Sequence, residues 1–261
     1  MLELFKKLFA PYDIELYPPS GMFTTSHFIA LLVIIIIIVV SILFSKKLTK
    51  ESVKKLCKIF ALVFTILETI KIMYNLLSGY TWLDAWFPLA YCSLFIYSLY
   101  LAGFGKGKTE KIGYSFLTGG GLFAGLFFLI FPTTSFMLHP AYHYLCIYSM
   151  LFHGSMIYMC IIILNKKVYE LSFKDYPYYL IFITVFSIIA ITMNLSFGCN
   201  MMFYDEPYNM PLKFVVDIYD FSKFLYTLLI YSAYSLLYGV MTIIYNFIKK
   251  LYNKVGLNGQ N

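Results

Sequence analysis

Apolar residues are concentrated in seven stretches of roughly 20 positions, separated by short polar segments, along this 261-residue chain. A helix of that length crosses the hydrocarbon core of a bilayer. The pattern therefore predicts an all-α, polytopic membrane protein built as a single bundle of seven transmembrane helices. The expected spans cover residues 27–44, 59–79, 87–104, 112–131, 144–164, 177–197 and 222–247.

Residues 1–26 have a different pattern. Leu4, Phe5, Leu8 and Phe9 surround two lysines, and a polar stretch rich in proline follows. This spacing is typical of a short helix that lies in the membrane interface. The segment lacks the apolar core and the cleavage site of a signal peptide. No internal repeat or linker is visible, so residues 1–261 are expected to form one transmembrane domain.

The lysines predict how the chain is oriented. The segments that would face one side carry six, three, three and three lysines, and those that would face the other carry two, none, none and two. Cytoplasmic segments of membrane proteins are enriched in positive charge. We therefore expect the N-terminus outside, the C-terminus in the cytoplasm, and a multi-pass protein of the cell membrane.

Composition narrows the class further. The chain is 61% hydrophobic and only 13% charged, with a net charge of +7 that comes from 20 lysines and no arginine. Lysine lacks the planar fork that reads phosphates and bases in a bidentate way, so a nucleic-acid partner is not expected. The positive charge is better explained by topology than by a polyanionic partner.

Two charged residues fall inside the second predicted span. Glu68 and Lys71 are three residues apart, which places them on one face of a helix. Charge in the middle of a membrane is unfavourable by about 2.5–3.5 kcal/mol on insertion scales, and a partner of opposite sign offsets much of it. The two residues form either a structural ion pair or part of a polar, functional cavity.

Two further motifs have a structural and a functional reading. Gly121 and Gly125 form a GxxxG pair, which predicts close helix packing rather than a phosphate-binding loop, because no Lys-Ser/Thr follows. His139 and His143 are four residues apart in an outer loop. With no acidic or cysteine ligand at a suitable spacing, ordinary polar roles are favoured over a metal site.

Cysteine and histidine supply the candidate chemistry. The five cysteines give no disulfide framework, and the sequence contains no CxxC, HExxH or GxSxG motif, so no metal and no cofactor is expected. Topology places Cys92 about 8 Å and His153 about 15 Å below the outer boundary. A cysteine and a histidine that meet can act as nucleophile and base, although each is also a common packing residue.

Three segments resemble the signature segments of the YwaF-like integral membrane proteins of bacteria. They are FPLAYC at 87–92, HYLCIYSMLFHG at 143–154 and NLSFGCNMMFYDEP at 194–207, in the family's order and at similar spacing. The family's eukaryotic relatives are multispan acyltransferases that act on ether phospholipids. The resemblance implies that Cys92 and His153 carry acyl transfer. The chain departs from the bacterial pattern at Ala90, where that pattern usually has a polar residue.

The resemblance implies a thiol-dependent acyltransferase that moves a fatty acyl group between membrane phospholipids. His143, Asn194 and Asn200 are expected to contact the substrate as hydrogen-bond donors, and Glu68 with Lys71 to line its cavity. Two other readings remain open. The same cavity suits a transporter or lipid-binding protein without covalent chemistry, and water in place of the second lipid gives a lipid hydrolase.

Overall fold

A computed structural model describes residues 2–10, 15–207 and 212–254. The described part consists of helices and connecting segments, without a β-strand, which confirms the all-α class. Parts of the predicted interfacial segment (residues 11–14) and of the predicted outer loop (residues 208–211) lie outside the described residues. The α-helices are α1 (Leu2–Leu8), α2 (Thr25–Phe44), α3 (Lys50–Leu77), α4 (Leu83–Trp86), α5 (Leu94–Phe104), α6 (Lys108–Thr118), α7 (Gly120–Ile130), α8 (Tyr144–Asn165), α9 (Tyr176–Phe197), α10 (Lys213–Phe221) and α11 (Lys223–Lys254).

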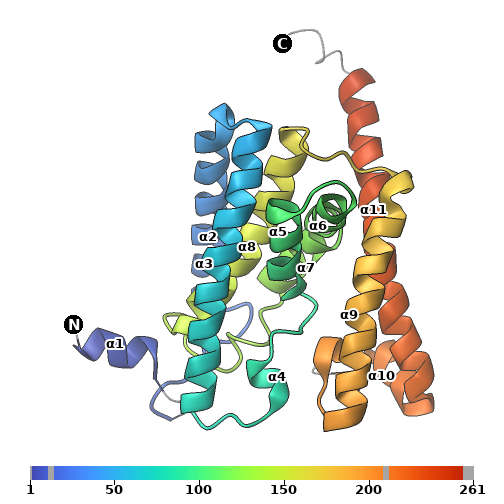
Figure 1. The fold of residues 1–261 in the computed structure, drawn as a ribbon. Coiled ribbons are helices and arrows are strands. Elements are labelled where there is room, and N and C mark those ends of the chain that lie inside the picture. Colours follow the sequence, from blue (N-terminus) through green and yellow to red (C-terminus); the bar gives the residue numbers. More distant parts are fainter. Residues whose placement is uncertain (1, 11–14, 208–211, 255–261) are drawn as a thin grey trace.

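The helices are arranged as a bundle with short helices at its centre. Figure 1 shows α2, α3 and α8 on one side, α9 and α11 on the other, and α5, α6 and α7 between them. Five segments are long and apolar enough to cross a membrane, namely Thr25–Lys47, Lys108–Ile130, Tyr144–Asn165, Phe173–Phe197 and Lys223–Asn253. The helix α3 has 28 residues but carries charge, and α5 has only 11 residues. Seven crossings therefore remain a prediction.

The third predicted span is helical over only part of its length. We expected a helix over residues 87–104, but α5 begins at Leu94 and residues 87–93 form turns. Pro88 has no backbone N–H to give to a helix, and Tyr97 instead donates a hydrogen bond to the Pro88 carbonyl oxygen at 3.2 Å. The fourth predicted span is also interrupted, because Gly119 adopts φ −98° and ψ −92° between α6 and α7.

Lysine-rich connections meet at one end of the bundle. Lys54 pairs with Glu110 at 3.0 Å, and Lys111 pairs with Asp175 at 3.4 Å. Lys166 donates a hydrogen bond to a backbone carbonyl of the connection between α2 and α3 at 2.6 Å. The ends that the lysine count assigned to one side are thus joined to one another by direct contacts.

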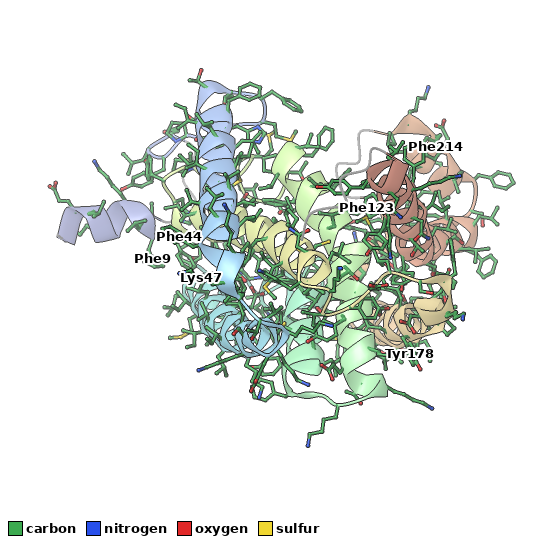
Figure 2. The ribbon with its side chains drawn as sticks, turned by 90° about the horizontal axis from the view of Figure 1, so that it is seen from above. Phe9, Phe44, Lys47, Phe123, Tyr178 and Phe214 are labelled. Carbon is green, nitrogen blue, oxygen red and sulfur yellow. The ribbon has the colours of Figure 1, made fainter. Side chains whose placement is uncertain are left out.

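Apolar side chains cover much of the outer surface, as a lipid environment requires. The helix α2 exposes most of its isoleucines and valines, and buries mainly Ile34 and Ile38 against the bundle. In the end-on view of Figure 2, the exposed Phe44 and Phe214 lie toward opposite edges of the molecule, whereas Phe123 lies between α7 and α11.

Candidate functional site

Cys92 lies in the turn that leads directly into α5. Its carbonyl accepts the backbone N–H of Phe95 at 3.0 Å, and the N–H of Ser93 is bonded to the Ala90 carbonyl at 2.9 Å. The first amides of a helix carry partial positive charge that favours an anion, so this position suits a reactive thiol.

Three phenylalanines join the elements that carry the candidate residues. Phe95 of α5, Phe152 of α8 and Phe64 of α3 pack edge to face, with ring centroids 5.2–5.8 Å apart. All three are at most 5% exposed. Aromatic rings that interlock in this way fix the relative height of the helices that hold them. These three residues, called the phenylalanine triad below, therefore fix the height along the bundle of the neighbouring residues on α3, α5 and α8.

A layer of polar residues lies one helical turn from the triad. Glu68 follows Phe64 by four residues, Cys92 precedes Phe95 by three, and Tyr148 precedes Phe152 by four. Because α3 runs opposite to α5 and α8, these three offsets point toward the same end of the bundle. The triad thus places Cys92 at the level of Glu68 and Tyr148.

Hydrogen bonds and charge join the members of this layer. Tyr148 donates a hydrogen bond to the Glu68 carboxylate, and Lys71 forms an ion pair with the same carboxylate. The predicted ion pair is thus present, and it is extended across two helices by Tyr148. The Glu68 side chain is only 6% exposed, whereas that of Lys71 is 25% exposed. Through this ion pair, the ammonium group of Lys71 lies against the polar layer.

His153 lies deeper than Cys92 and is held by two contacts. It follows Phe152 of the triad, and its ring stacks on Phe128 with centroids 3.7 Å apart. Its Nδ1 lies 2.7 Å from the Ser149 carbonyl oxygen, which can only accept, so Nδ1 carries the proton and Nε2 holds a lone pair. Within the described chain, no hydrogen bond joins Cys92 to His153. The structure therefore offers a base of the right tautomer about one turn below the thiol.

His143 and His139 form a separate cluster at the end of the bundle that carries α1. Their rings stack with centroids 4.1 Å apart. The Nε2 of His143 donates to the Ala10 carbonyl oxygen at 3.1 Å, and its Nδ1 accepts the N–H of Leu145 at 3.2 Å. Burial lowers the pKa of His143, and burial together with His143 lowers the pKa of His139 to about 4. Both rings are therefore neutral at pH 7, and the His143 ring ties the N-terminal segment to the bundle through Ala10.

Metal binding at this cluster finds no support in the described residues, where no group of three or more histidine, cysteine, aspartate or glutamate side chains is placed to hold an ion. The hydrogen bonds of His143 to Ala10 and Leu145 are those of an ordinary polar residue.

Asn194 and Asn200 organise the loop after α9. The Asn194 side chain accepts the N–H of Met201 at 2.7 Å and donates to its carbonyl oxygen at 3.1 Å. The Asn200 side chain bonds three backbone groups of Asp205 and Glu206 at 2.9–3.2 Å. The hydrogen-bonding groups of both asparagines are thus engaged within the fold, and their predicted contact with substrate remains a prediction.

The NMMF element at residues 200–203 holds an unusual backbone. Met202 and Phe203 have φ values of 54° and 56°, in the left-handed region that residues with a Cβ seldom occupy. Tyr234 of α11 donates to the Met202 carbonyl oxygen at 3.0 Å, and Tyr226 donates to that of Phe203 at 2.6 Å. Strain of this kind persists where surrounding contacts fix it, and here α11 supplies those contacts.

Tyr234 was not among the individual site residues predicted from the sequence, although the transporter alternative has the tyrosines of the seventh span line a pathway. Its ring stacks on that of Tyr91 at a centroid distance of 4.2 Å. Tyr91 is the residue directly before Cys92 in the sequence. Tyr234 therefore joins the FPLAYC and NMMF segments through α11. The spacing of Tyr226, Tyr234 and Tyr238 follows one face of a helix, which is the signal that identifies such a buried face.

A groove lies beside the polar layer, between α3, α5 and α9. Its volume is about 590 Å³, in the range of ligand-binding pockets. Ile181 and Val185 of its wall are half exposed on the outer surface of the bundle. Hydroxyl groups in the wall are bonded internally, for example Thr65 to the Ala61 carbonyl oxygen and to Tyr100. The lining residues are Thr65, Glu68, Thr69, Ile72, Pro88, Ile96, Tyr97, Tyr100, Leu101, Ile112, Ile181, Phe182, Val185 and Phe186.

Comparison with known proteins places the chain in a family. The TMEM164 family, a family of multispan membrane proteins, matches residues 22–247. No curated protein and no solved structure matches the chain. The family match covers all three motif segments, the phenylalanine triad, the polar layer and the groove. The chain is therefore a member of the TMEM164 family, and a multi-pass membrane protein.

Proposed function

We propose that the protein is an integral membrane acyltransferase that moves a fatty acyl group between phospholipids through a thioester on Cys92. The proposal is carried by one observation: Cys92 lies in the turn just before α5, at the level of the polar layer and beside an apolar groove open to the lipid side. A thiol at a helix start is suited to nucleophilic attack. A groove with hydrocarbon-like walls is suited to a lipid chain.

In the proposed reaction, the Cys92 thiol gives its proton to Nε2 of His153, and the sulfur attacks the ester carbonyl carbon of the donor lipid. The C–O bond breaks, the lysolipid oxygen takes the proton back from His153, and the acyl group remains on sulfur. The hydroxyl of a second lysolipid then gives its proton to His153 and attacks the thioester. Breaking of the C–S bond releases the Cys92 thiolate, which takes the proton back from His153, so atoms and charge balance over the cycle.

Glu68 and Lys71 are proposed to contact the substrate at the wall of the groove. A hydrogen-bond donor to the ester carbonyl oxygen stabilises the transition state by about 2.7–4 kcal/mol when well placed. The sequence predicts His143, Asn194 or Asn200 for this role. The backbone N–H of Ser93 is bonded to the Ala90 carbonyl oxygen, whereas that of Cys92 belongs to the same residue as the reacting sulfur. We propose that the Cys92 amide shares the role.

The proposed topology has seven spans, with the N-terminus outside and the C-terminus in the cytoplasm of a cell membrane. Contacts between the lysine-rich connections support it, since they gather at one end. The lipid substrate would then come from the outer leaflet. Kinship with YwaF-like proteins and with the ether-phospholipid acyltransferases is part of the same proposal, supported by the three motif segments.

Purified protein in lipid vesicles, with labelled lysolipid and unlabelled phospholipid, tests this function. Cys92→Ser and His153→Ala are each expected to lower transfer at least about 100-fold, because each removes a reacting group. Cys146→Ala removes a buried thiol that donates to the His139 carbonyl oxygen at 3.6 Å, away from the polar layer, so it is the matched control and is expected to keep transfer. Unchanged transfer by both Cys92→Ser and His153→Ala would contradict the proposal.

A non-enzymatic role in lipid binding or transport is the second candidate, because the groove and its charged wall residue Glu68 need no covalent step to hold a lipid. A thiol-directed acyl probe separates the two. Labelling of Cys92 that requires His153 favours the enzyme, and equal labelling of all five cysteines favours the second candidate. Release of free fatty acid instead of a new diacyl lipid indicates hydrolysis.

A further inference from the structure

Cys92 shares its layer with the ion pair that Glu68 forms with Lys71. We propose that Lys71 is a positioning residue for the nucleophile: its ammonium group stabilises the Cys92 thiolate, and Glu68 with Tyr148 hold that ammonium group in place. This inference rests on the proposed acyl transfer, and it names the group that makes the thiol reactive within the membrane.

The geometry of the layer carries the proposal. Glu68, Tyr148 and Cys92 each lie one turn from a member of the phenylalanine triad, on the same side of it. His153 lies beside the triad, one turn deeper. The groups at the height of the sulfur are thus those of the Glu68 cluster rather than the imidazole.

The hydrogen-bonding capacity of Lys71 leaves it able to act on a second anion. An ammonium group has three donors, and the ion pair with Glu68 uses the side facing that carboxylate. Tyr148 donates to the other oxygen of the carboxylate, which fixes its orientation.

Charge around the sulfur comes from one helix. In the described polar layer, Glu68 and Lys71 of α3 are the charged side chains, and they form one ion pair. From the other helices, Tyr148 of α8 is bonded to Glu68, and Tyr234 of α11 stacks on Tyr91, the residue before Cys92. Tyrosine side chains are uncharged at neutral pH. Charge interactions are strong in a medium of low dielectric constant. Loss of Lys71 alone is therefore expected to leave the negative charge of Glu68 uncompensated and to disfavour the Cys92 thiolate.

Alkylation of Cys92 by N-ethylmaleimide in the complete protein, followed by mass spectrometry of that one peptide, tests the inference without any lipid substrate. Lys71→Met is expected to slow alkylation at pH 7.5 roughly tenfold or more, because an adjacent opposite charge changes the thiolate fraction by at least that factor. The whole profile of rate against pH is expected to move to higher pH. Lys71→Arg keeps the charge and is expected to stay within about threefold of the wild type.

Lys58→Met on the same helix is the matched control, since Lys58 lies over the Phe104 ring away from the polar layer. It is expected to leave Cys92 alkylation unchanged. Where Lys71→Met reduces the yield of folded protein, the Glu68→Gln/Lys71→Met double variant leaves no unpaired charge. Its alkylation rate is expected to fall between those of the wild type and Lys71→Met.

A Lys71→Met or double variant that reacts as fast as the wild type would overturn the inference and leave the ion pair with a structural role only. Equal slowing by Lys71→Met and Lys71→Arg would overturn it as well, because a charge effect cannot produce that result. These outcomes are independent of acyl transfer. Slowed alkylation in a protein that transfers no acyl group would support Lys71 and reject the proposed function.

Discussion

The backbone of His153 lies directly against Gly125. A Cβ atom placed on Gly125 would be 2.8 Å from the His153 carbonyl oxygen and 3.0 Å from Cγ1 of Ile157. The other glycine of the GxxxG pair, Gly121, instead faces Phe116 of its own predicted span. Close helix packing was the role expected of this pair. Gly125 fulfils it against α8, and this contact fixes the position of the His153 backbone.

Gly125→Ala is expected to destabilise the protein by about 1–3 kcal/mol, because the neighbouring atom is a backbone oxygen that cannot move alone. Thermal unfolding in detergent measures the effect. The matched control is Gly239→Ala in α11, where the nearest atom to the new Cβ is a Phe173 ring carbon at 3.9 Å. This control is expected to be neutral or to stabilise by up to about 1 kcal/mol. Equal effects of the two substitutions would contradict the close contact.

Filling the groove is expected to impair acyl transfer. Val185 lies in the groove wall and is 48% exposed, and Val185→Trp introduces a large ring there. The expected loss in kcat/KM is roughly tenfold or more with a long-chain donor, and smaller with a short-chain donor. Ile36→Trp, at a 52% exposed position of α2 outside the groove, is the control. Similar losses from both variants would show that the groove does not receive the chain.

Acid is expected to weaken the attachment of the N-terminal segment. The pKa of His139 is lowered to about 4 from an ordinary value of 6.5, and that of His143 is lowered as well. A group with a lowered pKa contributes stability that is complete above pH 6.5 and is lost as pH falls toward 4. The melting temperature is therefore expected to be level between pH 8 and pH 6.5 and to fall below that.

His139→Gln, which cannot take up a proton in this range, isolates this contribution from that of the carboxylates. The fall in melting temperature between pH 6.5 and pH 4.5 is expected to be smaller in this variant than in the wild type. Identical pH profiles for the two proteins would exclude the histidine pair as the cause.

Local periodicity was enough to predict the helical class and most helix positions. The observed α8 begins at Tyr144 as expected, and α9 and α11 begin within one residue of the expected spans. The pairing of Glu68 with Lys71 was likewise predictable, since both residues lie on one helix. Features of this kind depend on residues close together in sequence.

Features that depend on distant residues could not be predicted in the same way. The turn at residues 87–93 needs the Tyr97 contact to Pro88 as well as the proline itself. The stack of Tyr234 on Tyr91 joins residues 143 positions apart. The engagement of His143 with Ala10, and the existence of the groove, similarly follow from how whole helices pack.

The exposed Ile181 and Val185 place the edge of the groove on the outer, lipid-facing surface of the bundle. Ligand binding there would depend on the concentration of the ligand in the bilayer rather than in water. A ligand that enters from the side arrives by diffusion within one leaflet and never crosses water. Occupancy of the groove then depends on the mole fraction of that lipid in the bilayer. Diluting the vesicles in buffer leaves it unchanged, whereas diluting the lipid with an inert one lowers it.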